Sequence, residues 1–359
     1  MAGLRDGVPQ RHHRLPGSTA DSEQKDRAKT WVALAAPLQL RMVPTTPSTT
    51  GATPGHALPV GATAAAQISA TPEATHQLLH WQAGRFRLAL RQALVMGIVN
   101  ITPDSFSDGG QKVDPRQALQ RCEQLVREGA HILDIGGEST RPGAPPVPAA
   151  EELRRVLPVV RAAVTLGVPV SVDTSKAEVM RAVLDAGADI INDVRALREP
   201  LALQTCAAHP SAGLCLMHMV GDPTTMQSLA VYDDVTRQVA AFLAVQLQRV
   251  LLAGVAAERV VLDPGYGFGK TLEQNCQLLA QQAQLLALGR PLLVGLSRKG
   301  MLGTLTGGKP AHERVPASVA AALAAVEAGA HVVRVHDVAA TVDALKVWRR
   351  LRQPFVAAA

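Results

Sequence analysis

Eight groups of polar residues follow short apolar runs along the chain, and their side chains are the ones that could do chemistry. One polar residue after a strand means little, because turns require such residues. Eight groups that combine carboxylates, amides and cations are harder to explain as turn chemistry, so they predict a ligand site. The groups are Asn100; Glu138 with Thr140 and Arg141; Asp173; Asn192 with Asp193; His218; Asp263; Ser297 with Arg298 and Lys299; and Arg334 with His336.

Three of these residues suit a flat, nitrogen-rich ring. Asp173 and Asp263 can accept hydrogen bonds from ring N–H groups, and Asn192 adds a donor and an acceptor. This set matches the edge of an amino-pyrimidinone. In the alternative interpretation, Asp173 and Asp263 cap the helices that follow them, and for Asp173 the residues alone do not decide between the two.

The cationic residues predict an anion site. Arg334 and His336 are two positions apart on one apolar run, so their side chains point to the same side. Together with Lys299 and Arg141 they suit an anion, with phosphate as the expected ligand. The alternative, solvated surface cations, explains poorly why an arginine lies inside the run Val332–Val335.

Metal ligands are few in the sequence. Asn100 is the candidate ligand for a hard cation such as Mg²⁺, which takes phosphate oxygens and water as its other partners. The four cysteines, Cys122, Cys206, Cys215 and Cys276, form no C-x-x-C pair. Their spacing suits neither a zinc site nor a disulfide framework, so we expect a protein of the reducing cytoplasm.

The glycine-rich segment Gly265–Thr271 resembles a nucleotide-binding P-loop but does not match the pattern. The P-loop requires a further glycine where this chain has Pro264. We therefore interpret the segment as a loop whose glycines let the backbone approach a flat ligand closely.

Apolar runs that alternate with amphipathic stretches must position these groups. Strands that alternate with helices of ten or more residues predict βαβ units, and eight units match an α/β fold of the (β/α)8 TIM-barrel type. A doubly wound sheet would need a G-x-G-x-x-G pattern after its first strand, and the segment after Val99 lacks one. The expected strands are 94–99, 131–135, 168–172, 189–191, 214–217, 260–262, 292–296 and 332–335, and the expected helices are 115–128, 149–166, 176–186, 199–209, 235–254, 273–288, 313–328 and 338–351.

The two ends of the sequence differ in composition. Residues 1–80 are of low complexity, and a segment so rich in Pro, Ser, Thr, Gly and Ala predicts a disordered extension. Residues 81–355 are expected to form the barrel. The formal charge of +6, from 36 basic and 30 acidic residues, does not indicate nucleic-acid binding. No apolar stretch is long enough for a membrane helix, so we expect no membrane partner.

The residues between Phe86 and Leu351 resemble the dihydropteroate synthase family of pterin-binding enzymes. The first two of the segments below are highly specific as extended strings, and the shorter ones add weight through their order. The segments are Met96–Gly110, Asp134–Gly143, Ser171–Lys176, Ile191–Val194, Met217–Met219, Leu262–Lys270, Gly295–Lys299 and Arg334–Asp337.

The resemblance implies a transferase of folate biosynthesis, EC 2.5.1.15. Its substrates would be 7,8-dihydropterin-6-ylmethyl diphosphate and 4-aminobenzoate, and its products 7,8-dihydropteroate and diphosphate. It also implies assistance by Mg²⁺, a homodimer, and inhibition by sulfonamides. Two rival functions remain: a methyltetrahydrofolate-binding methyltransferase on a related barrel, and a catalytically silent pterin-binding homologue.

The resemblance also implies roles for individual residues. The pterin would be held by Asp173, Asn192, Met217, Asp263, Gly267, Phe268 and Lys299. The diphosphate would be held by Asn100, Arg334 and His336, with Asn100 as metal ligand. The aminobenzoate would be held on two mobile loops by Phe106, Thr140, Arg141 and Pro142. The expected catalytic residues are Asp108, Thr140, Arg141, Asp173 and Lys299.

Removal of the extension is expected to leave the enzyme unchanged. A chain that begins near Leu79 should keep its melting temperature and catalytic constants, because no residue before it has core-forming periodicity. Differential scanning calorimetry and steady-state kinetics of the full and shortened chains check this. A fall of several degrees on truncation would mean that the extension packs on the barrel.

Overall fold

The computed structural model describes residues 79–102, 114–141 and 143–352. The chain divides into two units, Met1–Glu73 and Ala74–Ala359, and every described residue belongs to the second. The expected extension, apart from Leu79 and His80, lies outside the described residues.

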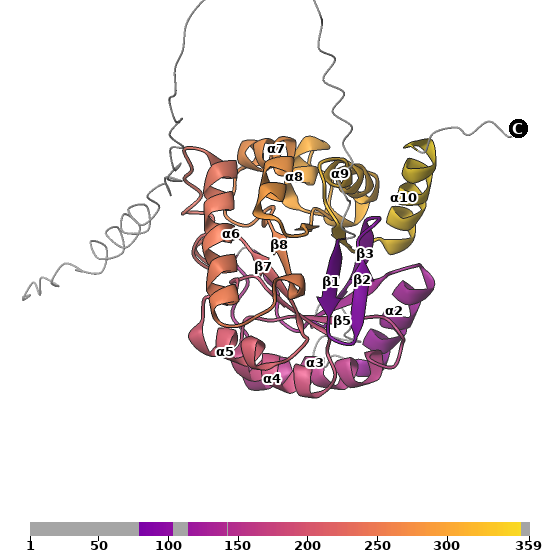
Figure 1. Cartoon of the computed structure of the whole chain (residues 1–359). Coiled ribbons are helices and arrows are strands. Elements are labelled where there is room, and N and C mark those ends of the chain that lie inside the picture. Colours follow the sequence, from indigo (N-terminus) through magenta and orange to yellow (C-terminus); the bar gives the residue numbers. More distant parts are fainter. Residues whose placement is uncertain (1–78, 103–113, 142, 353–359) are drawn as a thin grey trace, which may run out of the picture. The chain divides into compact units, whose positions relative to one another are not determined.

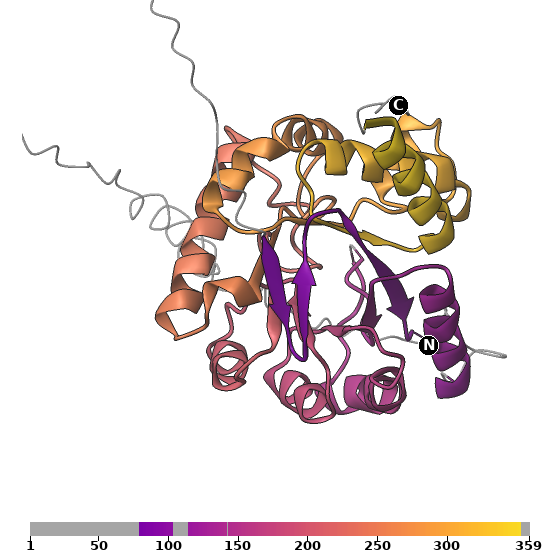
Figure 2. The same cartoon turned by 45° about the vertical axis from the view of Figure 1, so that its right-hand side comes forward.

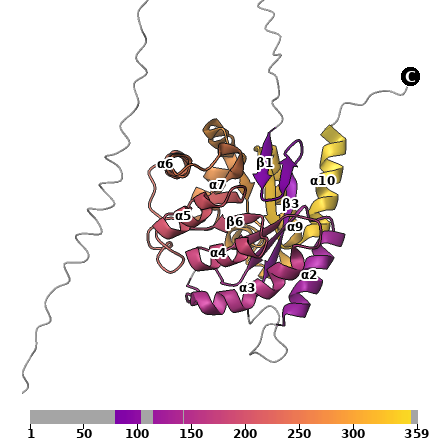
Figure 3. The same cartoon turned by 60° about the horizontal axis from the view of Figure 1, so that its bottom comes forward.

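Eight parallel strands form the centre of the described unit, in the order β8-β7-β6-β5-β4-β3-β10-β9. A parallel bridge between Leu262, in β8, and Leu292, just before β9, joins the two edges of this sheet. Helices surround the strands, as Figures 1 and 3 show. The expected (β/α)8 barrel is therefore confirmed.

The strands lie close to their expected positions. They are β3 Leu94–Asn100, β4 Ile132–Gly136, β5 Val170–Asp173, β6 Ile190–Asp193, β7 Gly213–Met217, β8 Val260–Asp263, β9 Leu293–Val294 and β10 Val332–Val335.

The helices also follow the predicted alternation, with two additions and one division. The short helix α8 and the 3-10 helix η1 lie outside the predicted helices, and the predicted helix 273–288 is divided into α7 and the 3-10 helix η2. The helices are α2 Pro115–Arg127, α3 Ala149–Ala163, α4 Ala177–Asp185, α5 Pro200–Ala208, α6 Val235–Leu252, η1 Ala257–Arg259, α7 Leu272–Ala280, η2 Gln282–Leu288, α8 Gly300–Leu305, η3 Ala311–Glu313, α9 Val315–Glu327 and α10 Val338–Arg352. None of these helices combines the length and hydropathy that a membrane span requires.

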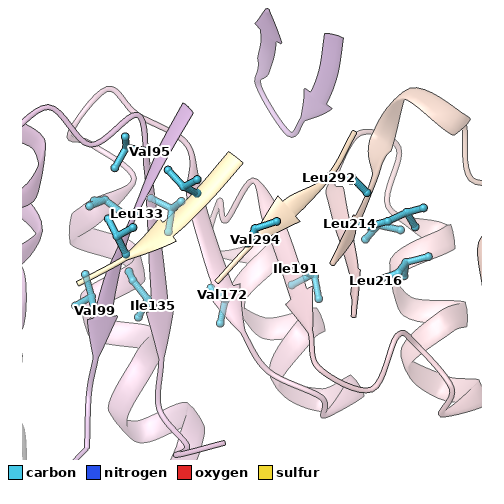
Figure 4. Packing of buried hydrophobic residues seen from close by; sticks show 14 of the residues in the cluster. Val95, Val99, Leu133, Ile135, Val172, Ile191, Leu214, Leu216, Leu292 and Val294 are labelled. Atoms are coloured by element: carbon cyan, nitrogen blue, oxygen red, sulfur yellow. The ribbon is translucent and has the colours of Figure 1, made fainter. Parts of the chain in front are cut away.

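Both faces of the barrel strands are buried, which explains why the strands read as apolar runs. Alternate residues such as Val99, Ile135 and Val172 belong to the main core, which also includes the helices (Figure 4). The residues between them face the barrel interior, because successive side chains of a strand point to opposite sides. Near the start of the strands these inner residues are apolar, as with Met96 and Ile190.

A hairpin that the sequence did not reveal packs against this inner apolar layer. Its strands, β1 His80–Ala83 and β2 Phe86–Ala89, pair antiparallel and are drawn in indigo in Figure 2. Trp81 is fully buried among the inner residues, and its Nε1 donates to the carbonyl oxygen of Arg259 at 3.0 Å. The hairpin thus closes the barrel at the end where the strands begin, which leaves the opposite end for the site.

Candidate functional site

The polar side chains that face the barrel interior lie near the carboxyl ends of the strands. Asp173 and Asn192 are neighbours across β5 and β6, and Met217 and Asp263 are neighbours across β7 and β8. Arg334 faces the same interior from β10. This is the end of the barrel at which TIM-barrel enzymes place their active sites. The structure thus brings these five predicted residues together at one end of the barrel.

Arg334 binds two aspartates at once. Its Nε donates to Asp134 Oδ2 at 2.6 Å, and its other guanidinium nitrogen NH2 donates to Asp173 Oδ2 at 3.0 Å. Asn192 Nδ2 donates to the same Asp134 oxygen at 3.2 Å. The Arg334 side chain is only 19% exposed, so the solvated-surface interpretation is wrong. Asp173 does not cap α4 either, since that helix begins at Ala177 with Lys176 as its N-cap.

Burial shifts the pKa values of the charged residues at this end of the barrel. It raises the pKa of Asp173 and Asp263 above the ordinary carboxyl range, although Arg334 opposes the shift at Asp173 and the Gly265 N–H opposes it at Asp263. Burial also lowers the pKa of Lys299, and repulsion by Arg334 adds to the effect. Burial alone would lower the pKa of Arg334, but Asp134 and Asp173 outweigh it, so the pKa is raised. Arg334 therefore keeps its charge.

Lys299 and Phe268 form one wall of the cluster. The Lys299 Nζ lies 3.9 Å from the centre of the Phe268 ring, a cation–π distance. A Cβ at Gly267 would lie 3.1 Å from Lys299 Cδ, so a larger residue there would press on the lysine. Met217 and Phe268 share a small apolar cluster with Met219. The predicted pterin residues therefore combine an apolar wall with a polar edge.

The contacts of Lys270 account for the glycine-rich segment Gly265–Thr271 better than binding of a nucleotide does. This lysine is 4% exposed, and its Nζ donates to the carbonyl oxygens of Gly265 at 2.8 Å and Phe268 at 3.1 Å. It also contacts His218 Nδ1 at 3.0 Å, and burial lowers the pKa of Lys270 to about 7. A Cβ at Gly265 would stand 1.9 Å from the His218 carbonyl oxygen, so the loop glycines serve a close approach to protein atoms. His218 is part of this support.

Two contacts with Ser297 hold His336 in place. Its backbone N–H donates to Ser297 Oγ at 3.1 Å, and the Ser297 hydroxyl lies 3.0 Å from His336 Nδ1. Burial, and then the charge of Arg334, lower the pKa of His336 to about 3. The ring is therefore neutral at pH 7, with one N–H group. His336 can thus offer an anion a hydrogen bond but no charge, while Arg334 and Lys299 supply the charge.

The segment after β4 is fixed at its base. Glu138 accepts from the Val147 N–H at 3.0 Å and pairs with Lys176, which also binds the buried Glu152 at 2.6 Å. Thr140, half-buried, and Arg141, exposed, lie on this segment.

The remaining predicted residues divide into two groups. Asn100 ends β3 and is half-buried. Phe106, Asp108 and Pro142 lie outside the described residues. In the part of the chain that the structure describes, no group of three His, Cys, Asp or Glu side chains could hold a metal ion.

The sequence reasoning missed Asp134. This residue is fully buried, and its Oδ1 has no hydrogen-bond partner among the described residues. A signal was available, because Asp134 interrupts the apolar run His131–Ile135. A charged residue in a strand that is buried on both faces indicates a paired charge inside the barrel.

Comparisons with known proteins show the family to which this chain belongs. A family model described as "pterin binding enzyme" matches residues 96–336. The dihydropteroate synthase of Neisseria meningitidis serogroup B is 51% identical over 276 residues, which are 76% of this chain and 97% of that protein. This chain belongs to the dihydropteroate synthase family. Its members are transferases, and the expected family and enzyme class are thus confirmed.

Solved structures of the family have the same barrel. The dihydropteroate synthase of Burkholderia cenocepacia, solved with 7,8-dihydropteroate, is 52% identical with a TM-score of 0.70, covering 76% of this chain and 96% of that one. The dihydropteroate synthase of Yersinia pestis, solved with a sulfonamide drug, is 47% identical with a TM-score of 0.72, covering 76% and 99%.

The raised carboxyl pKa values predict how pterin binding depends on pH. When ionised, Asp173 and Asp263 accept hydrogen bonds from ring N–H groups at both oxygens, whereas protonation turns one oxygen of each carboxyl group into a donor. Because burial raises the pKa of both, pterin affinity should fall on acidification at a pH well above 3.9, the value of an ordinary aspartate. Calorimetric titration with a dihydropterin between pH 8 and pH 5 measures this. Asp263→Asn should remove the part of the fall that Asp263 causes and leave the part that Asp173 causes, whereas Asp343→Asn, on the exposed part of α10, should change neither. A flat profile in the unchanged protein would contradict the prediction.

Proposed function

We infer that this chain catalyses the dihydropteroate synthase reaction. It condenses 7,8-dihydropterin-6-ylmethyl diphosphate with 4-aminobenzoate, giving 7,8-dihydropteroate and diphosphate. One observation carries the inference: Asp173, Asn192 and Asp263 converge inside the mouth of a barrel whose chain is about half identical to dihydropteroate synthases. The B. cenocepacia relative binds 7,8-dihydropteroate, which is the expected product.

The pterin is proposed to lie edge-on to the buried acids. Asp173 and Asp263 accept hydrogen bonds from ring N–H groups, and Asn192 meets the ring with both a donor and an acceptor. Met217 and Phe268 contact the face of the ring, and Gly267 leaves room for Lys299. Arg334 supports this arrangement through its contact with Asp173.

We propose that the diphosphate lies beside Arg334, Lys299 and His336. Arg334 and Lys299 supply positive charge, and the neutral His336 adds a hydrogen-bonding group. A Mg²⁺ ion would neutralise charge on the leaving group. The chain fits such an ion at Asn100, a hard oxygen donor at the end of β3, the strand next to β10. Mg²⁺ needs only one or two protein ligands when it also binds phosphate oxygens.

The reaction replaces one bond by another at the pterin methylene. The C–O bond to diphosphate breaks, the aniline nitrogen forms a C–N bond, and this nitrogen loses one proton, which the released diphosphate takes up. Arg334 and Lys299 stabilise the departing charge electrostatically. Thr140 and Arg141 are proposed to orient the aminobenzoate, together with Phe106, Asp108 and Pro142, and to keep water from the methylene cation.

Three properties of the whole protein belong to the same proposal. The catalytic domain spans residues 81–355, the protein acts as a homodimer in the cytoplasm, and nucleic acids and membranes are not its partners. The four cysteines support the compartment, since all are free thiols.

Two assays separate the three candidate functions. The purified protein is mixed with both substrates and diphosphate release is followed, and in parallel the demethylation of methyltetrahydrofolate is measured. A synthase releases diphosphate, a methyltransferase removes the methyl group of methyltetrahydrofolate, and a silent homologue binds the pterin without either reaction. Pterin binding without diphosphate release would overturn the proposed function.

Sulfonamides are expected to compete with one substrate only. A sulfonamide has the shape of 4-aminobenzoate, so it should raise the KM of aminobenzoate, and it should not compete with the pterin substrate. Its affinity should also rise strongly once diphosphate and Mg²⁺ fill the anion site, if binding is ordered. Calorimetry with the drug alone, and then with both additions, checks this. Equal affinity in the two conditions would contradict ordered binding.

A further inference from the structure

Two segments at the mouth of the barrel are joined by an ion pair that the proposed reaction does not use. Arg298 lies between Ser297 and Lys299 after β9, and Asp337 follows His336 after β10. The Arg298 Nε donates to Asp337 Oδ2 at 3.0 Å, and its NH2 donates to Asp337 Oδ1 at 2.5 Å. This two-point geometry fixes direction as well as distance.

The backbone of Arg298 is strained. Its φ is +59°, in the left-handed region that residues other than glycine rarely adopt. Neighbouring groups hold it there: the Arg298 N–H donates to Ser318 Oγ at 2.9 Å, and Arg314 donates to the Arg298 carbonyl oxygen at 3.0 Å. Strain of this kind persists only where the surroundings over-determine the conformation, and it is concentrated at functional sites.

The strained residue lies directly beside two proposed substrate ligands. Lys299 is the next residue along the chain, and its side chain lies over Phe268. On the partner segment, His336 precedes Asp337 and binds Ser297 through both its ring and its backbone N–H. The pair between Arg298 and Asp337 therefore fixes the position of Lys299 relative to His336.

We propose that Arg298 is a positioning residue, which acts through Asp337 to hold Lys299 and His336 at the spacing of the pterin methylene and its diphosphate. This role rests on the proposed function. In this role the Arg298–Asp337 pair aligns the end of the site that binds the pterin with the end that binds the anion. Neither residue of the pair contacts the substrate in this role.

Single and double variants test the pair. Arg298→Gln and Asp337→Asn each remove one charge, and the double variant removes both. Arg154→Gln is the matched control, because Arg154 is not among the proposed site residues and makes a similar two-point contact with Glu151 on α3, at 2.8 and 2.7 Å. For each protein, kcat/KM for the pterin diphosphate is measured, together with the affinity for inorganic diphosphate with Mg²⁺ and the melting temperature.

The proposal predicts that each single variant lowers kcat/KM by about 10- to 100-fold, as expected when reacting groups are misplaced by about 1 Å. The double variant should lose no more than either single one, because both act through the same contact. Diphosphate affinity should fall as well, and Arg154→Gln should behave as the unchanged protein.

Two results would overturn the positioning role. One is a lower melting temperature with unchanged kcat/KM and diphosphate affinity, which would make the pair merely structural. The other is additive losses in the double variant, which would mean that the two residues act separately. Failure of the proposed function is distinguishable from both, because the unchanged protein itself would then release no diphosphate from its substrates.

Discussion

Replacement of Arg334 by methionine is expected to lower turnover of the pterin diphosphate by about two orders of magnitude. A charge-assisted contact with the diphosphate is worth about 1.5–3 kcal/mol, which is roughly 10- to 100-fold in rate. Arg334 also holds Asp173, so pterin binding should weaken with it. A pterin without diphosphate should therefore lose affinity too, which would not be the case for a cation that contacts only the anion.

The same change is expected to destabilise the fold. Asp134 and Asp173 would remain buried without their cation, and breaking a buried ion pair costs about 3–5 kcal/mol. The double variant Arg334→Met/Asp134→Asn should recover much of the stability by removing one of these charges, but not the turnover. Urea unfolding and steady-state kinetics of the two proteins measure both effects. Unchanged turnover in Arg334→Met would contradict the role of Arg334 at the anion site.

Replacement of Trp81 by alanine is expected to have the largest effect on stability outside the site. Truncation of a buried tryptophan costs about 3–5 kcal/mol, because it leaves a cavity. The carbonyl oxygen of Arg259 would also lose its donor. We expect a lower melting temperature and urea midpoint, with kcat retained at a temperature where the variant is folded, because Trp81 lies at the end of the barrel opposite the site.

Arg87→Ala in the same hairpin is the matched control, since Arg87 is exposed. It should change neither the melting temperature nor kcat. A Trp81→Ala protein with the stability of the unchanged protein would show that the hairpin does not close the barrel in solution.

The hairpin is the part of the fold that could not be predicted from the sequence. The eight barrel strands could be predicted because burial on both faces makes each strand a continuous apolar run. The strand Phe86–Ala89 alternates between half-buried and exposed residues, and with four residues per strand the hairpin gives little periodic signal. Only the inner layer of the barrel, formed by residues distant in sequence, explains why Trp81 is buried.

The residues of the site could be predicted from the sequence, but the contacts between them could not. Because all barrel strands end at one rim, polar residues after each run had to converge there. The pairing of Arg334 with Asp134 joins residues 200 positions apart, and only the order of the strands brings them together. For the same reason the sequence did not reveal that Lys270 Nζ binds carbonyl oxygens of its own loop.

The coupling of diphosphate release to C–N bond formation tests the central claim most directly. Purified protein is supplied with 7,8-dihydropterin-6-ylmethyl diphosphate, Mg²⁺ and 4-aminobenzoate, and both products are quantified over time. We expect one 7,8-dihydropteroate for each diphosphate, and almost no diphosphate release when aminobenzoate is left out. Release at the same rate without aminobenzoate, or no 7,8-dihydropteroate with both substrates present, would contradict the assignment of this chain as the condensing enzyme.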